Sequence, residues 1–320
     1  MQSYEKINYA VRPNKRTQRK MIFEALSHVI GRFSSKKYGY VGFGSMWFSD
    51  FLYAHRRLRL TSLTSIERSE GYRRAVFNRP FRCVRVVEGD SSEVLPKLKW
   101  KNATIVWLDY DFQPELDSLG DVSFLAGNLV SGSVLMVTYD ARPPWGQAAG
   151  SEEKTASLVK TFGEPARSVW RNRSKIAKRY GATSDIADLF PYLLVHLLWM
   201  FCKDLLIQNG RAAAEGLACY PLFSFYYKDG APMVTLGLAL VDAKDRATLD
   251  SAPLQSEFHF LTGETLFPIA VPPLTPKERA ALDLCLPSRT PRPSFPLDAE
   301  QIRAYANLYQ YYPLLAEVDL

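Results

Sequence analysis

The stretch Tyr40-Val41-Gly42-Phe43-Gly44 begins a pattern that continues to residue 139: an apolar run of strand length, a turn, and a segment long enough for a helix. The same pattern puts Glu67 at the end of the second run, Asp90 just after the third and Asp109 at the end of the fourth. Because parallel strands need long crossover connections, the alternation predicts a parallel sheet covered by helices. Such sheets bind ligands at the carboxyl ends of their strands, so these positions are candidate site residues.

The expected sheet has seven strands. The first five are predicted at residues 38–43, 63–67, 83–87, 104–109 and 134–139. Two further β-rich runs, 219–227 and 233–241, are separated by Lys228-Asp229-Gly230-Ala231-Pro232, and an Asp-Gly turn between strands indicates an antiparallel hairpin. The fold class is therefore α/β: a Rossmann-like, mostly parallel sheet with an antiparallel last strand, followed by a small C-terminal α+β appendage.

We divide the chain into three parts: a basic helical segment at 1–37, a Rossmann-like domain at 38–244 and an appendage at 245–320. The appendage is expected to hold a hairpin of residues 257–261 and 266–270 and two helices. Thr275-Pro276-Lys277-Glu278 and Asp298-Ala299-Glu300-Gln301 carry the capping signatures that start these helices. Extra elements of this kind make the appendage a candidate surface for a protein partner.

The N-terminal helix is amphipathic. Its apolar positions between Ile22 and Ile30 fall on one face, and Gly31 is the expected stop. The opposite face carries Lys15, Arg16, Arg19 and Lys20. This cluster could contact phosphate, or it could be the solvated side of the helix, which is the commoner arrangement.

Charge and cysteine content restrict the classes of function. The net charge of +7 is concentrated in residues 1–100, which contain 20 lysines and arginines against eight acids, as expected of a polyanion-binding surface or of scattered solvated side chains. The four cysteines show no metal-type spacing and are expected to be reduced. The longest apolar run, 189–201, is too short to span a membrane, and no signal sequence is apparent, so a cytoplasmic location without membrane contact follows by elimination.

A glycine pair after the first strand, with an acid ending the second, suits two classes of protein: dinucleotide-dependent oxidoreductases and S-adenosylmethionine-dependent methyltransferases. The dinucleotide fingerprint requires a third glycine, and Trp47 stands there. With the Gly89-Asp90 pair and the closing hairpin, residues 38–241 resemble a class I S-adenosylmethionine-dependent methyltransferase. The resemblance implies that Gly42 and Gly44 pass under the methionine moiety, Glu67 holds the ribose and Asp90 faces the adenine.

The resemblance also places Asp109 and Asp111 after the fourth strand, where these enzymes hold catalytic or substrate-orienting groups. Either carboxylate could act as a general base, or both could bind a divalent metal; we expect no metal site, because no third carboxylate is paired with them. The alternative for Asp111 is that it caps the helix near Pro114.

Two departures from the family pattern leave a second hypothesis open. Tyr40 stands where the family has an acid, and Met46 where it has a third small residue. A non-catalytic Rossmann-like subunit that has lost the cofactor and binds a partner or nucleic acid would also carry such changes. An open cleft beside Gly42 and Glu67 would favour the enzyme, and a cleft filled by Met46, Trp47 or Phe48 would favour the subunit.

The chain is also similar to a set of bacterial proteins described as O-methyltransferase-like. The segments that carry this similarity are Arg12-Pro13-Asn14-Lys15, Val41-Gly42-Phe43-Gly44-Ser45, Trp107-Leu108-Asp109-Tyr110-Asp111, Leu274-Thr275-Pro276-Lys277-Glu278 and Tyr311-Tyr312-Pro313.

The best local signal for a substrate is the basic segment at 167–180. It contains six basic residues, no acid and two aromatic residues, a mixture that neutralises phosphate and stacks on bases. Arg171, Arg173 and Lys175 are the candidate substrate-binding residues, and a nucleic acid or another polyanion is the expected substrate. A solvated basic helix explains the same composition.

Overall fold

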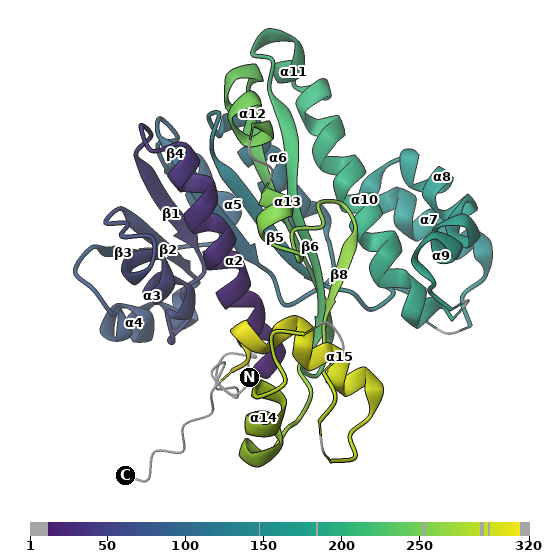
Figure 1. Ribbon diagram of the computed structural model, residues 1–320. Helices are drawn as coiled ribbons and strands as arrows, with labels where there is room; N and C mark the ends of the chain where they lie inside the picture. Colours follow the sequence, from purple (N-terminus) through teal and green to yellow (C-terminus); the bar gives the residue numbers. More distant parts are fainter. Residues whose placement is uncertain are drawn as a thin grey trace.

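The computed structural model describes residues 12–146, 148–183, 185–251, 254–288, 291–293 and 295–313. Within them, helices cover both faces of one eight-stranded sheet (Figure 1). The strands are β1 (Tyr38–Gly42), β2 (Leu63–Glu67), β3 (Val84–Glu88), β4 (Ala103–Asp109), β5 (Val134–Asp140), β6 (Ala218–Lys228), β7 (Pro232–Val241) and β8 (Leu266–Ile269). Their order across the sheet is β3-β2-β1-β4-β5-β7-β6-β8.

The predicted topology is confirmed for the first seven strands. Strands β1 to β5 are parallel, and β7 is inserted between β5 and β6 and runs antiparallel to both. The central strands β4 and β5 are almost entirely buried, as expected for strands covered on both faces. The chain therefore has the Rossmann-like fold of the methyltransferase type.

The C-terminal hairpin prediction is wrong. Residues 254–257 form a helical turn, α13 (Leu254–Glu257), and only Leu266–Ile269 forms a strand. That strand, β8, pairs in parallel with residues 224–227 of β6 and becomes the eighth strand of the main sheet. Phe260 and Leu261, expected in the hairpin, are instead buried in the core beside α2, so hydrophobic burial overrides the strand pattern there.

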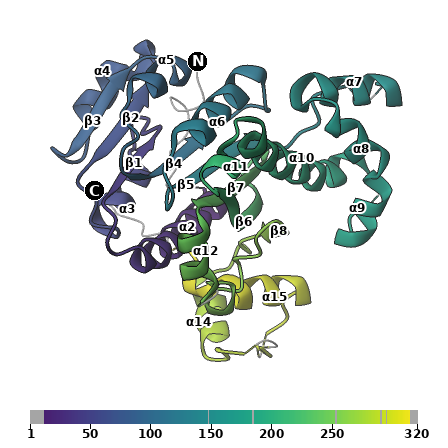
Figure 2. The same ribbon diagram turned by 90° about the horizontal axis from the view of Figure 1, so that it is seen from above.

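The helices form two layers (Figure 2). One face carries α2 (Pro13–Arg32), α3 (Ser49–Arg56), α12 (Ala243–Asp250) and α13, and the other carries α5 (Ser91–Val94), η2 (Leu95–Lys97), α6 (Leu116–Asn128) and α10 (Ile186–Gln208). Helix α4 (Ser69–Asn78) connects β2 to β3, and α11 (Arg211–Ala214) leads into β6. The N-terminal helix continues one residue past the expected stop, Gly31.

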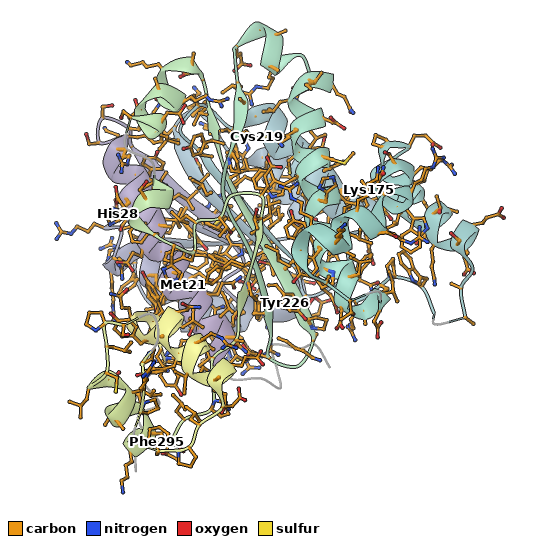
Figure 3. The ribbon with its side chains drawn as sticks, turned by 45° about the vertical axis from the view of Figure 1, so that its right-hand side comes forward. Met21, His28, Lys175, Cys219, Tyr226 and Phe295 are labelled. Carbon is orange, nitrogen blue, oxygen red and sulfur yellow. The ribbon has the colours of Figure 1, made fainter. Side chains whose placement is uncertain are left out.

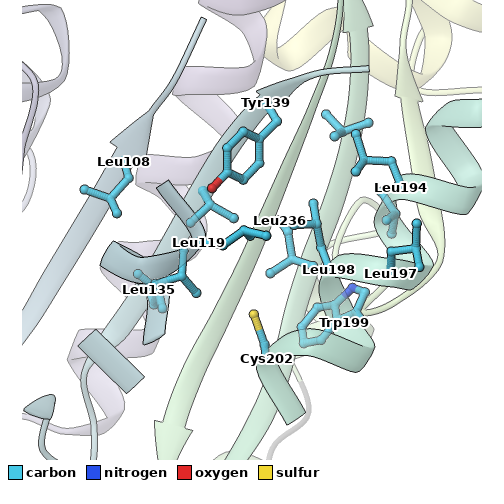
Figure 4. Close-up of a cluster of buried hydrophobic side chains, with 14 of the residues drawn as sticks. Leu108, Leu119, Leu135, Tyr139, Leu194, Leu197, Leu198, Trp199, Cys202 and Leu236 are labelled. Carbon is cyan, nitrogen blue, oxygen red and sulfur yellow. The ribbon is translucent and has the colours of Figure 1, made fainter. Parts of the chain in front are cut away.

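The larger core lies between the sheet and α6 and α10 (Figure 4). Leu135 of β5 and Leu236 of β7 lie there with Trp199 and Cys202 of α10. The indole nitrogen of Trp199 donates to the Ser224 hydroxyl at 2.9 Å, so its one polar atom is satisfied. Helix α10 is long and apolar enough to cross a membrane, but 61% of that stretch is buried within the structure, as in a core helix.

Two groups of helices lie outside these layers. Helices α7 (Ser151–Phe162), α8 (Pro165–Arg171) and α9 (Arg173–Tyr180) form a group on the outer side of α10 (Figures 1 and 2). The C-terminal helices α14 (Pro276–Asp283) and α15 (Ala299–Leu308), with η3 (Tyr309–Tyr311), lie near the start of α2. Their predicted starts are confirmed: Thr275 and Asp298 are the caps.

Candidate active site

A cavity of about 460 Å³ opens at the carboxyl ends of the parallel strands, close to where α2 begins. Its wall combines the loop after β1, the end of β2, the turns after β3 and β4, the first turn of α2 and the turn between β6 and β7. Four residues expected at the site line it: Gly44, Glu67, Asp109 and Asp111. The topology therefore brings together groups that are far apart in the sequence, as the strand-end rule requires.

The two glycines of the first loop are held mainly by contacts within the protein. A Cβ on Gly42 would lie 2.9 Å from the Trp107 carbonyl oxygen of β4, so Gly42 allows β1 and β4 to approach. A Cβ on Gly44 would lie 2.5 Å from the Phe48 ring and 2.6 Å from the Ser65 hydroxyl. Gly44 lines the cavity, whereas Gly42 lies against the neighbouring strand and is not among the described residues that line the cavity.

Bulky residues of the same loop leave the cavity open. Phe48 is fully buried behind the loop and contacts Phe51 edge to face. Trp47 is 41% exposed, and the Met46 sulfur accepts a hydrogen bond from Arg74. None of these three residues is among the described residues that line the cavity.

Glu67 connects the cavity to the glycine loop. One carboxylate oxygen accepts hydrogen bonds from the Gly44 backbone N–H at 2.9 Å and from the Ser65 hydroxyl at 2.8 Å. Burial raises the pKa of Glu67, and these hydrogen bonds only partly oppose the rise. The carboxyl group therefore holds the loop and also lines the cavity.

Asp90 lies at the rim. Its carboxylate forms an ion pair with Arg68 at 2.7 Å, and its side chain is 57% exposed. It lines a shallower neighbouring hollow, whereas Gly89 and Ser91 on either side of it line the main cavity. Gly89 has φ 137°, a conformation that favours glycine.

Asp109 is paired with Lys15, which the sequence pattern did not place at the site. The Lys15 ammonium lies 2.6 Å from one oxygen of Asp109, and the lysine side chain is only 4% exposed. Burial lowers the pKa of Lys15, and the charge of Asp109 opposes that shift. The expectation that the basic side of the first helix is solvated is therefore wrong for Lys15, and it is also wrong for Arg19, which is 6% exposed.

A signal for these two residues was present in the sequence. Lys15 and Arg19 continue the line of Ile22 and Leu26 at spacings of four, three and four residues, which places them on the buried stripe of α2. Arg19 forms a buried ion pair with Asp50 of α3 at 2.6 Å, and both line the cavity.

Asp111 is exposed at the cavity, and the suggestion that it caps the following helix is wrong. Helix α6 starts at Leu116, and its N-cap is Glu115, whose backbone N–H is bound by Ser118.

Among the described residues, no group of three histidine, cysteine, aspartate or glutamate side chains could hold a metal ion.

The turn between β6 and β7 fixes the start of α2. Asp229 accepts hydrogen bonds from the backbone N–H of Lys15 at 2.8 Å and from the Asn14 side chain at 2.9 Å. The Asn14 side-chain oxygen Oδ1 in turn accepts a hydrogen bond from the Val271 backbone N–H at 2.7 Å. The Arg12-Pro13-Asn14-Lys15 motif thus joins the hairpin and the C-terminal segment at the edge of the cavity.

The three predicted substrate-binding residues lie elsewhere. Arg171 and Lys175 are exposed on α8 and α9, and Lys175 lies in the outer helical group, away from Met21 of α2 (Figure 3). The Arg173 guanidinium stacks 4.6 Å from the Trp170 ring centroid and donates to the Trp170 carbonyl oxygen, so it has a structural role. None of the three is among the described residues that line the cavity.

Comparison with solved structures gives only distant similarity. An O-methyltransferase family protein from Burkholderia thailandensis has 10% identity and a TM-score of 0.37, over 70% of this chain and 56% of its own. The N-methyltransferase NodS from Bradyrhizobium japonicum WM9 has 10% identity and a TM-score of 0.38, over 72% of this chain and 97% of its own. For LepI in complex with SAH and a substrate analogue, 10% identical with a TM-score of 0.33, the match covers 64% of this chain and 43% of LepI.

No curated protein matches the sequence. A family model does, and it covers residues 7–320, nearly the whole chain. The chain belongs to the family described as "Putative O-methyltransferase".

Proposed function

We propose that this protein transfers a methyl group from S-adenosylmethionine to a hydroxyl group of an acceptor bound in the cavity. The observation that carries the proposal is the open cavity of about 460 Å³ that is lined together by Gly44, Glu67 and Asp109. These are the strand-end residues that the sequence pattern selects for the cofactor and for the chemistry. Membership of the O-methyltransferase family supports the reaction class.

The cavity wall suits the cofactor. Gly44 has no space for a side chain, so its backbone forms the surface that would lie beside the methionine part. Glu67 would accept the ribose hydroxyls, and the turn containing Gly89, Asp90 and Ser91 would face the adenine. When bound, S-adenosylmethionine supplies a methyl group on a positively charged sulfur.

The residues of this chain have two tasks in such a reaction: to hold the acceptor in line and to remove its proton. The carboxylates Asp109 and Asp111 both line the cavity after β4, as proposed catalytic groups should. Tyr227 and Met233, from the strands joined by the β6–β7 turn, line the same cavity and would contact the acceptor.

The alternative, a subunit that has lost its cofactor, is less well supported. Met46, Trp47 and Phe48 are not among the described residues that line the cavity, and Tyr40 is packed between Phe23 and Phe51 in the core. Tyr40 therefore replaces the usual acid without closing the site.

A protein partner for the C-terminal helices stays a prediction, as do the three-part division and the cytoplasmic location.

A nucleic acid or other polyanionic substrate also stays a prediction. The basic residues that suggested it lie on α8 and α9, outside the cavity. A polymer would have to extend from this helical group to the cavity in order to use both.

Calorimetric titration with S-adenosylmethionine tests the proposed function. We expect saturable binding to the full-length protein and at least about a tenfold weaker affinity for Glu67→Ala, because hydrogen bonds to a charged group contribute about 1.5–3 kcal/mol. Glu153→Ala, on the exposed first turn of α7, is the matched control and should bind as the wild type does. A folded protein that does not bind millimolar cofactor would contradict the proposal.

A further inference from the structure

Lys15 occupies an unusual position for a lysine. Its side chain is 4% exposed, yet the residue lines the cavity. The ammonium nitrogen lies 2.6 Å from Asp109, 5.2 Å from the Trp107 ring centroid and 5.4 Å from the Tyr227 ring centroid. Two aromatic rings and one carboxylate thus hold the amine beside the space proposed for the acceptor.

The position of Lys15 is fixed from both ends. Its backbone N–H is bound by Asp229, and its side chain is bound by Asp109, so the first turn of α2 spans the gap between the hairpin and β4. Such immobilisation is costly in side-chain entropy unless the contacts compensate for it. A lysine that served only to cover apolar surface would keep its charged end in water.

The titratable groups that face the amine come from four elements: Asp109 of β4, Asp50 of α3, Arg19 of α2 itself and Tyr227 of β6. Asp229 of the β6–β7 turn binds the Lys15 backbone N–H instead. Burial favours the neutral amine, Arg19 acts in the same direction, and Asp109 and Asp50 oppose it. The net result is a lowered pKa for Lys15, so the neutral form is easier to reach than for an exposed lysine.

We propose that Lys15 is a catalytic residue whose ε-amine accepts the proton of the acceptor hydroxyl, while Asp109 orients that amine and balances the ammonium charge that forms. This inference rests on the proposed methyl transfer. It gives Asp109 a supporting task in place of the general-base role that the sequence alone suggested.

The step is balanced. The acceptor O–H bond breaks and its proton forms a new N–H bond on Lys15. The oxygen electron pair forms the O–CH₃ bond, and the electron pair of the broken S–CH₃ bond remains on sulfur, which becomes a neutral thioether. The ammonium ion then returns its proton to solvent past Asp109, whose side chain is 20% exposed.

The charge of the cofactor would assist the first part of this step. A positively charged sulfur in the same cavity disfavours a second positive charge on Lys15, so it favours the neutral amine that the step requires. The neutral thioether product, S-adenosylhomocysteine, lacks this effect. Comparing the two ligands therefore separates a response to charge from a response to filling the cavity.

The test is competitive acylation of the full-length protein with acetic anhydride over a range of pH, read by mass spectrometry. Only neutral amines react, so the pH midpoint of labelling reports the protonation of each lysine. Exposed Lys175 on α9 is the internal reference. We expect the midpoint of Lys15 to lie at least about one pH unit below that of Lys175, and S-adenosylmethionine to lower it by about one further unit relative to S-adenosylhomocysteine, as a like charge in the same site does.

Each outcome is decisive. If calorimetry shows that both ligands bind but the Lys15 midpoint is the same with each, or matches that of Lys175, the catalytic role of Lys15 is wrong and the proposed function stands. A Lys15 that is never labelled in the ligand-free protein also overturns the role, because a base must be reachable from the cavity. If S-adenosylmethionine does not bind, the proposed function itself fails and the role of Lys15 fails with it.

Asp109→Asn gives an independent check. Removing the carboxylate charge removes an interaction that favours the ammonium form, so the Lys15 midpoint should fall further in this variant. An unchanged midpoint in a folded Asp109→Asn protein would contradict the assigned pairing.

Discussion

Asp229, in the turn between β6 and β7, caps the first turn of α2 from more than 200 residues away in the sequence. It accepts hydrogen bonds from the backbone N–H groups of Asn14 and Lys15 at 3.3 Å and 2.8 Å. We expect Asp229→Ala to lower the free energy of unfolding by about 1–2 kcal/mol, the usual effect of losing an N-terminal cap. Because Lys15 and Arg19 would shift, the affinity for S-adenosylmethionine should fall as well. Urea denaturation and calorimetry measure the two effects.

The matched control is Asp298→Ala. Asp298 caps α15 through the backbone of Glu300 and Gln301, and it does not line the cavity. It should lose similar stability without losing cofactor affinity. If both variants bound the cofactor equally well, the anchoring of α2 would have no part in shaping the site.

The Asp229 cap is an example of a contact that the sequence alone could not predict. The alternation of apolar runs predicted five parallel strands and a closing antiparallel hairpin, because each crossover length and the Asp-Gly turn are local properties. Periodicity likewise predicted the buried face of α2. It could not reveal that Lys15 meets Asp109 or that Arg19 meets Asp50, since those partners come from other elements, 94 and 31 residues away. The strand predicted at 266–270 is present as β8, but its predicted partner was wrong for the same reason: four residues carry no information about which strand edge they will join.

Glu67→Gln should weaken cofactor binding without lowering the stability of the protein. The folded-state pKa of Glu67 is raised by burial, so this carboxyl group favours the folded state at low pH, and that contribution is lost as pH rises through the folded pKa. A glutamine is neutral at every pH and can still accept from the Gly44 N–H. We therefore expect Glu67→Gln to be at least as stable as the wild type at pH 8, with the difference shrinking towards pH 4.5, where wild-type Glu67 is increasingly protonated.

The same variant should bind S-adenosylmethionine about tenfold more weakly, because charged hydrogen bonds are about twice as strong as neutral ones. Guanidinium denaturation at the two pH values and calorimetry at pH 8 measure these effects. The opposite result would be a stability of Glu67→Gln, relative to the wild type, that is lower at pH 8 than at pH 4.5. It would show that the ionised form of Glu67 is the one that stabilises the loop.

Gly44→Ala should destabilise the fold from within the glycine loop. The added Cβ would be 2.5 Å from the Phe48 ring and 2.6 Å from the Ser65 hydroxyl, and both groups are fixed by their own packing. Overpacking of this kind typically costs about 1–3 kcal/mol, so we expect a loss of that size in urea denaturation.

Gly120→Ala is the opposite case. Gly120 lies inside α6, and a Cβ there meets nothing within 4 Å. Alanine has the higher helix propensity, so this variant should gain about 0.5–1 kcal/mol. Two variants with the same chemical change and opposite signs would establish that space, and not loss of glycine flexibility as such, determines the requirement at residue 44.

The basic helices α8 and α9 give a prediction that separates polyanion binding from the cavity. Changing exposed Arg171 and Lys175 together to glutamine removes two positive charges but leaves Arg173 on Trp170. If single-stranded DNA binds here, the plot of log affinity against log salt should become shallower by about 1.4, since each phosphate contact on a single strand contributes about 0.7 to the slope. The affinity for S-adenosylmethionine should stay within about twofold, because these side chains do not line the cavity and exposed charges are screened beyond about 10 Å.

The matched control is a Lys244→Gln/Lys277→Gln protein, which has the same change in net charge on other exposed sites. An equal reduction of the salt slope in that control would show that the DNA responds to net charge and not to α8 and α9.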